Sequence, residues 1–101
     1  MKGDAAKGGP VVLVVDDERS VRYALDELLS GDGHVVVTAA SGAEALEVVQ
    51  RHEVAMVVTD IAMPGMSGLE LLAAIRAHDA SLPVVVITAH GSERVAVEAM
   101  R

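Results

Sequence analysis

The sequence contains no cysteine, tryptophan or phenylalanine, and Tyr23 is its one aromatic residue. Without cysteine the chain holds neither a disulfide framework nor a thiolate metal site. Its apolar runs are far shorter than the roughly 20 residues of a membrane-spanning helix. The first ten residues also carry no apolar stretch of the kind found in signal peptides. Together these absences favour a cytoplasmic protein that does not enter a membrane.

Positive charge is also scarce. The chain has eight lysine and arginine residues and fifteen aspartate and glutamate residues, so its formal net charge is -7. The basic residues are scattered and form no stripe. Because an acidic surface repels nucleic acid and anionic membranes, we expect no direct binding to either.

Valine, alanine and leucine dominate what is present, and 51% of the 101 residues are hydrophobic. This length and composition predict one globular domain. Residues 1–10 are interpreted as a flexible leader, and residues 11–101 as the domain.

Four apolar runs lack the polar alternation of half-exposed strands. Continuous valine-rich and isoleucine-rich runs are typical of parallel strands that are buried on both faces. The predicted strands cover residues 11–15, 34–40, 54–60 and 82–89.

Helical patterns separate and follow these runs. Residues 21–29 place apolar side chains on one helical face, and two Ser-x-x-Glu capping boxes begin at Ser41 and Ser67. Gly91, Ser92 and Glu93 are expected to open a fourth helix. Its apolar face would consist of Val95, Ala96, Ala99 and Met100.

The predicted order of strand and helix, repeated four times, indicates an α/β fold with a parallel sheet and helices on both faces. The strand spacing places a fifth strand a few residues beyond Arg101. We therefore expect a truncated domain that lacks its last strand and helix. A complete four-stranded domain is the alternative.

Polar residues gather at the carboxyl ends of three predicted strands. Asp16 and Asp17 follow the first, Asp60 ends the third and Thr88 lies at the end of the fourth. Ligands of parallel α/β sheets bind at this edge. Individually, such aspartates are ordinary helix caps and turn residues, so the hypothesis of a site depends on their combination.

Two carboxylates about 4 Å apart repel each other by about 4 kcal/mol at an effective dielectric constant near 20. A cluster of three therefore retains a proton or binds a cation. Oxygen ligands without cysteine favour Mg²⁺ or Mn²⁺ over zinc. Beside such an ion, Asp60 could attack phosphorus and the Thr88 hydroxyl could donate to a phosphoryl oxygen.

Three segments together resemble the receiver domain of two-component response regulators: VLVVDDE (12–18), VVTDIAMPGMSGLELL (57–72) and VVVITAHGS (84–92). The second and third segments are most similar to regulators of the nitrogen-regulation type. The resemblance covers residues 11–101. It implies a flavodoxin-like, doubly wound parallel sheet with strand order 2-1-3-4-5, here without the fifth strand and its helix.

The resemblance also implies a role for each site residue. Asp60 corresponds to the phospho-acceptor, and Asp16 and Asp17 to the acid pair that binds Mg²⁺ with the backbone carbonyl of Ala62. Thr88 corresponds to the switch hydroxyl. The donor would be a phosphohistidine of a sensor histidine kinase, and the receiver would catalyse its own phosphorylation without independent turnover. An output domain is expected outside this chain.

The family also uses a lysine at the end of its fifth strand, whereas the two lysines here are Lys2 and Lys7. One alternative is therefore a non-catalytic receiver fragment that cannot signal. An exposed apolar fourth strand would make such a fragment dimerise through that edge or through exchanged elements. A Mg²⁺-dependent phosphohydrolase is a second alternative, although such enzymes usually have acids two residues apart on the first strand.

Overall fold

The computed structural model describes the backbone of residues 10–90 and 93–99 and the side chains of residues 10–87. Most of the predicted leader, the predicted opening of the fourth helix at Gly91 and Ser92, and Met100 lie outside these residues. None of the described helices is long and apolar enough to cross a bilayer.

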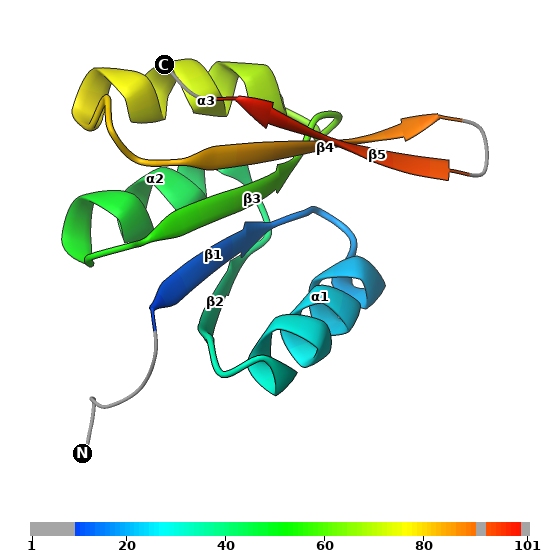
Figure 1. The fold of residues 1–101 in the computed structure, drawn as a ribbon. Helices are drawn as coiled ribbons and strands as arrows, with labels where there is room; N and C mark the ends of the chain where they lie inside the picture. The colour runs from blue at the N-terminus through cyan, green and yellow to red at the C-terminus, as the bar shows by residue number, and fades with distance from the viewer. Residues whose placement is uncertain (1–9, 91–92, 100–101) are drawn as a thin grey trace.

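Five strands and three helices form the described part of the chain (Figure 1). The strands are β1 (Val11–Val15), β2 (Val35–Ala39), β3 (Met56–Asp60), β4 (Val84–His90) and β5 (Glu93–Ala99). The helices are α1 (Arg19–Gly31), α2 (Gly42–Arg51) and α3 (Gly68–His78).

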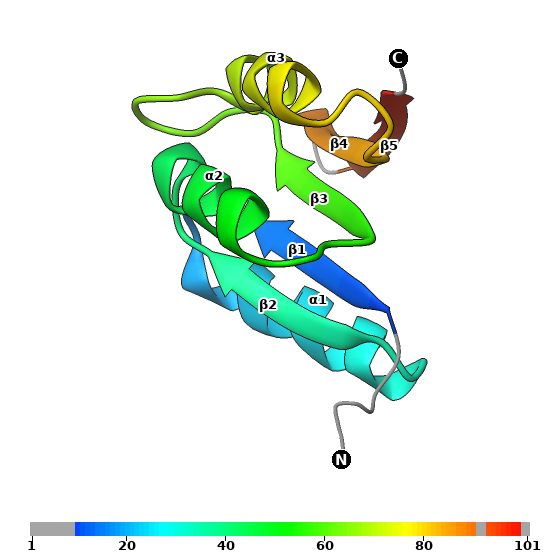
Figure 2. The same ribbon diagram turned by 90° about the vertical axis from the view of Figure 1, so that its left-hand side faces the viewer.

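The sheet order is β2-β1-β3-β4-β5, and β2, β1, β3 and β4 pair in parallel. Helix α1 covers one face of the sheet, and α2 and α3 cover the other (Figures 1 and 2). This doubly wound arrangement of four parallel strands confirms the flavodoxin-like prediction.

Alternation along β1 divides the apolar residues between two cores. Leu13 and Val15 lie in the cluster beneath α2 and α3, whereas Val12 and Val14 lie in the cluster that contacts α1. Successive side chains of a strand point to opposite faces. A valine-rich run without polar alternation is therefore what a strand between two cores requires.

The two predicted helix caps are present. The Ser41 hydroxyl accepts a hydrogen bond from the backbone N–H of Glu44, and the Ser67 hydroxyl accepts one from Glu70. At α3 the capping box is complete, because the Glu70 carboxylate accepts the N–H of Ser67 in return. At α2 the Glu44 carboxylate instead accepts the N–H of Ala40.

The fourth-helix prediction is wrong in this structure. Residues 93–99 form β5, which pairs antiparallel with β4 along the register from Val84 opposite Ala99 to His90 opposite Glu93. Pairing along β4 outweighs the helical pattern, because an apolar strand otherwise leaves a row of unpaired backbone groups at its edge. The predicted exposed edge of β4 is therefore covered by β5.

Helix α3 allows a direct test of the larger core. Leu71 is fully buried, whereas Leu69, on the same helix, is 54% exposed. We expect Leu71→Ala to lower the free energy of unfolding by about 2–5 kcal/mol, because it leaves a cavity. Leu69→Ala, the matched control, should change it by less than about 1 kcal/mol. Urea denaturation followed by circular dichroism would measure both. Equal losses would contradict the assignment of the core.

Candidate metal centre

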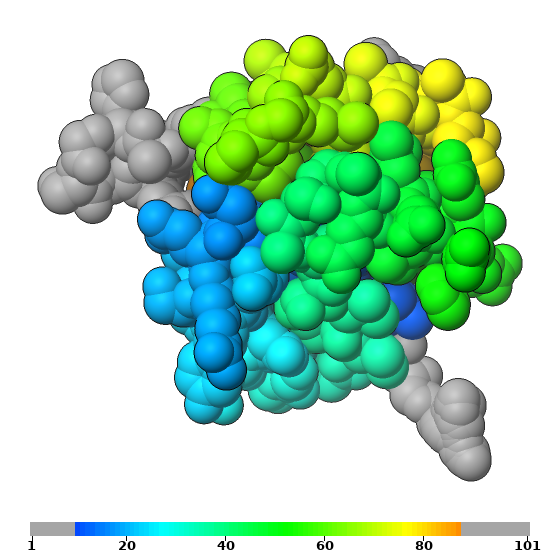
Figure 3. Space-filling view, turned by 180° about the vertical axis from the view of Figure 1, so that it is seen from behind, coloured from blue at the N-terminus to red at the C-terminus, as the bar shows by residue number. Residues whose placement is uncertain are grey.

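Parallel pairing of β1 with β3 brings residues 16 and 60 to one edge of the sheet. The register pairs Val15 with Thr59, so Asp16 and Asp60 each lie one residue beyond a paired position. The segment after β1 also lies against the loop between β3 and α3 in the space-filling view, where blue meets yellow-green (Figure 3).

The side chains of Asp16, Asp17 and Asp60 converge at this edge. Each offers a carboxylate oxygen, and these oxygens all lie within 4.8 Å of one another. Asp16 is buried, Asp60 is half-buried and Asp17 is exposed. The cluster thus has a buried base and an open side. Its oxygen-only donors are of the kind that Mg²⁺ and Mn²⁺ prefer.

Backbone and side-chain hydrogen bonds fix the position of Asp16. Its N–H donates to the carbonyl of Ala39 over 3.2 Å, and its carboxylate accepts the N–H of Glu18 over 2.9 Å. The Asp16 carbonyl accepts a hydrogen bond from the Arg22 guanidinium over 2.7 Å. Residues of β2 and α1 therefore hold the first acid in place.

Neither acid of the pair is the N-cap residue of α1. Helix α1 begins at Arg19, and its N-cap residue is Glu18, which makes no side-chain capping bond. Asp16 and Asp17 precede the cap, in the turn that leaves β1. Helix capping therefore does not account for these two acids.

A second set of contacts fixes Asp60. The Thr59 hydroxyl donates to the Asp60 carbonyl over 3.0 Å. The N–H of Ile61 donates to the carbonyl of Ile87 over 3.0 Å. The N–H of Gly68 donates to the carbonyl of Ile61 over 2.8 Å. The first residue of α3 is thus bound directly to the carbonyl of the residue that follows Asp60.

Glycine is required at residue 68. A Cβ placed there would lie 2.2 Å from the Asp60 carbonyl oxygen and 2.8 Å from the Ile61 Cα. Both are backbone atoms that no side-chain rotation can move. In the sequence Gly68 stands out only as part of a capping box, because its contact with β3 depends on how α3 meets that strand.

Gly42 has a related role on α2. A Cβ there would lie 2.8–3.0 Å from the side chain of Met66, which belongs to the loop between β3 and α3. The start of α2 and this loop therefore pack closely together. This packing limits how far the loop that follows Asp60 can move toward α2.

The two other predicted site residues lie near Asp60, one through the chain and the other through strand pairing. Ala62 is exposed and follows Asp60 by two residues in the loop between β3 and α3. Thr88 lies within β4, one residue beyond Ile87, which is the register partner of Asp60. The side chain of Thr88 is outside the described part of the structure.

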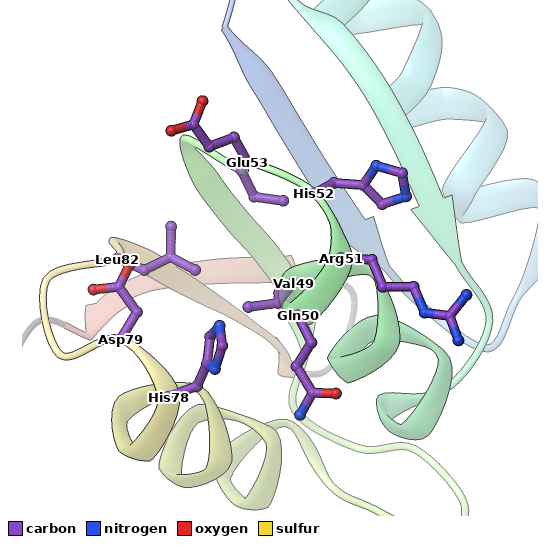
Figure 4. Close-up of a pocket in the computed structure, with 9 residues that line it drawn as sticks. Val49, Gln50, Arg51, His52, Glu53, His78, Asp79 and Leu82 are labelled. Carbon is purple, nitrogen blue, oxygen red and sulfur yellow. The ribbon is translucent and has the colours of Figure 1, made fainter.

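A different hollow, of about 390 Å³, lies at the opposite end of the sheet (Figure 4). Val49, His78, Asp79 and Leu82 are among its lining residues, whereas the ring of His52 points away from its centre. The hydroxyl and N–H of Ser81 donate to the Asp79 carboxylate and lower the pKa of this group. Because sheets of this kind bind ligands at their carboxyl edge, we place the candidate site at the aspartate cluster.

Comparison with known proteins identifies what the chain is similar to. The profile of the response regulator receiver domain matches residues 12–101. The response regulator protein FleR of Pseudomonas aeruginosa is 44% identical over 90 residues, and the DNA-binding transcriptional regulator NtrC of Escherichia coli K12 is 42% identical over 89. These alignments cover 89% and 88% of this chain, but 19% of each relative. The chain thus corresponds to about a fifth of the length of these relatives.

Solved structures agree with the fold. The response regulator TrrA of Thermotoga maritima, in complex with Mg²⁺-BeF, is 37% identical with a TM-score of 0.79, over 82% of this chain and 72% of that one. TrrA in complex with the histidine kinase ThkA is 36% identical with a TM-score of 0.77, over 84% and 75%. The predicted similarity to receivers of the nitrogen-regulation type is confirmed by the relatives found.

Substitution at Gly68 tests the close packing beside Asp60. We expect Gly68→Ala to lower the free energy of unfolding by about 1–3 kcal/mol, because the new methyl group overlaps backbone atoms. Gly31→Ala is the matched control, since Gly31 has no atom within 4 Å of a built Cβ. It should leave stability unchanged or raise it slightly. Urea denaturation would measure both variants. A Gly68→Ala variant as stable as the control would contradict the contact.

Proposed function

Because the chain belongs to the response regulator receiver domain family, we propose that it is the phospho-accepting receiver module of a two-component response regulator. It takes a phosphoryl group from the phosphohistidine of a sensor histidine kinase onto Asp60. The observation that carries this proposal is the convergence of three carboxylates from two strand ends, with the oxygens within 4.8 Å of one another.

The donor set fits a divalent cation. We infer that Asp16, Asp17, Asp60 and the backbone carbonyl of Ala62 would hold Mg²⁺ or Mn²⁺. When bound, the ion supplies positive charge that offsets the anionic oxygens of a phosphoryl group. The Mg²⁺-BeF complex of TrrA supports this part of the proposal by similarity.

In the proposed transfer, a carboxylate oxygen of Asp60 forms a bond to phosphorus as the phosphorus–nitrogen bond of the donor breaks. The electron pair of that bond leaves with the imidazole, and Asp60 becomes an aspartyl phosphate. Its half-buried position leaves one side of the carboxylate open to a donor. We also propose that Thr88 donates its hydroxyl to a phosphoryl oxygen, since it follows the register partner of Asp60.

The partner and setting are proposed on the same basis. The complex of TrrA with the histidine kinase ThkA supports a sensor kinase as the partner. The alignment covers 19% of the DNA-binding regulator NtrC. We propose that the output domain corresponds to a part of that relative outside the aligned region. A net charge of -7 supports the absence of direct nucleic-acid binding by this chain. The cytoplasmic location remains a prediction from composition.

Phosphorylation can be tested directly on the chain. We expect incubation with Mg²⁺ and acetyl phosphate to add one phosphoryl group per molecule, at Asp60, as measured by intact-mass spectrometry. Asp60→Asn should abolish the adduct, because it removes the attacking carboxylate. Asp32→Asn, at the exposed end of α1, is the matched control and should retain it. Chelation of the cation should also prevent the adduct.

The same experiment separates the alternatives. Continued release of inorganic phosphate, in excess of protein, would favour a phosphohydrolase. Absence of any adduct on the wild-type chain with acetyl phosphate, and of any complex with beryllofluoride, would favour a non-catalytic receiver fragment. An adduct that persists in Asp60→Asn would contradict the assignment of the acceptor.

Self-association is proposed through exchange of β5. Dimerisation through an exposed edge of β4, the other predicted mode, is not available because β5 pairs with that edge. Exchange would preserve every β4–β5 pair, with the β5 of one copy on the β4 of another, and so gives a low-cost route to a dimer.

Light scattering at increasing protein concentration would measure this dimer. We expect Val97→Pro to abolish it, because proline removes a strand hydrogen bond opposite Val86. Leu28→Lys, on the exposed surface of α1, should leave the dimer intact. A wild-type chain that stays monomeric at every concentration, or a dimer lost only with Leu28→Lys, would contradict exchange of β5.

A further inference from the structure

Asp16 and Asp60, the two acids at the strand ends, share a feature of their backbone hydrogen bonding. In each, the backbone carbonyl accepts a hydrogen bond from a side chain outside the cluster: Arg22 donates to Asp16 over 2.7 Å, and Thr59 donates to Asp60 over 3.0 Å. We propose that Arg22 and Thr59 are positioning residues that set the direction of the two carboxylates. This proposal rests on the proposed binding of a divalent cation by the cluster.

The carbonyls matter because each belongs to a residue at which the chain leaves the sheet. Neighbouring backbone groups still bond to the sheet: the N–H of Asp16 donates to the carbonyl of Ala39, and the N–H of Ile61 donates to the carbonyl of Ile87. Backbone groups at strand ends need partners outside the ladder. Metal and catalytic groups must be held to within about 0.5 Å of the productive geometry. The side-chain donors at these two carbonyls supply the missing backbone partners and also hold the acids in position.

Thr59 is the more informative of the two residues. It is fully buried, and it follows Val57 and Val58 in the same strand. A buried hydroxyl is unfavourable relative to an apolar group unless its hydrogen bond compensates. Valine would fill the same space and has a higher preference for strands. Packing alone therefore favours valine at residue 59. The hydrogen bond from the hydroxyl to the Asp60 carbonyl accounts for the presence of threonine there.

Replacement of Thr59 by valine should therefore affect stability and cation binding in opposite directions. Thr59→Val should leave the free energy of unfolding unchanged or raise it, while the binding of a divalent cation becomes weaker. A residue with a purely structural role would lower stability when replaced. Thr59→Ser retains the hydroxyl and should retain the affinity.

Substitution of Arg22 distinguishes the effect of its hydrogen bond on cation binding from the effect of its charge. Arg22 is half-buried, and its guanidinium links the first turn of α1 to the residue that follows β1 through the Asp16 carbonyl. Loss of a nearby positive charge would by itself strengthen cation binding, whereas loss of the hydrogen bond would weaken it. Weaker binding in Arg22→Met would therefore identify positioning as the dominant effect. Arg22→Lys keeps both a charge and a donor.

The experiment is a Mn²⁺ titration of the full chain followed by electron paramagnetic resonance, with urea denaturation of each variant without metal. We expect Thr59→Val and Arg22→Met to raise the dissociation constant about threefold to tenfold, the range expected for one hydrogen bond. Thr59→Ser and Arg22→Lys should stay within about twofold of wild type. Arg19→Met, an exposed arginine on the same helix, is the matched control and should also stay within that range.

The outcomes distinguish this proposal from the one on which it rests. If the wild-type chain binds Mn²⁺ and both Thr59→Val and Arg22→Met bind it equally well, the positioning proposal is overturned and the metal site stands. If the wild-type chain binds no Mn²⁺, the proposed metal site fails and the positioning proposal fails with it. Thr59→Val that loses affinity and stability together would overturn the positioning role, because general packing would then explain both losses.

Discussion

Parallel pairing of β1 with β3 is the constraint on which the candidate site depends. Val15 pairs with Thr59, so the residues that follow meet at one edge of the sheet although more than forty positions separate them in the sequence. Antiparallel pairing would place one of these ends at the far edge. The crossover through α1, β2 and α2 that parallel strands require therefore also brings the acids together.

Close packing then converts this proximity into a defined arrangement. Carboxylates that repel each other would separate unless their backbone were fixed. Gly68 lies so close to the Asp60 carbonyl that a Cβ would overlap it, and Gly42 allows Met66 to pack on α2. The loop after Asp60 is thus held at both ends, by the start of α3 at Ile61 and by the start of α2 at Met66. A cation that binds there meets ligands whose backbone is already positioned, so less conformational entropy is lost on binding.

Much of this arrangement could be predicted from the sequence. Valine-rich runs gave the four parallel strands, and the serine caps at Ser41 and Ser67 gave the starts of two helices. The meeting of Asp16 and Asp60 at one edge of the sheet followed from their places at the ends of parallel strands. Residues 93–99 could not be predicted, because their helical pattern is local and their pairing with β4 is not. The contacts of Arg22 and Gly68 depend on how α1 and α3 meet the sheet, which periodicity does not specify.

The acidity of the chain acts on this site in two opposing ways. A net charge of -7 draws divalent cations toward the aspartate cluster, but it also repels the anionic phosphoryl group that Asp60 would accept. A cation bound at the aspartate cluster would offset the repulsion of the phosphoryl group, because its charge lies within a few ångströms of Asp60. Charges elsewhere on the chain are screened over roughly 8 Å at physiological salt. Binding of the cation before the donor is therefore the order that electrostatics favours. The fixed carbonyls of Asp16 and Asp60 contribute to that first step.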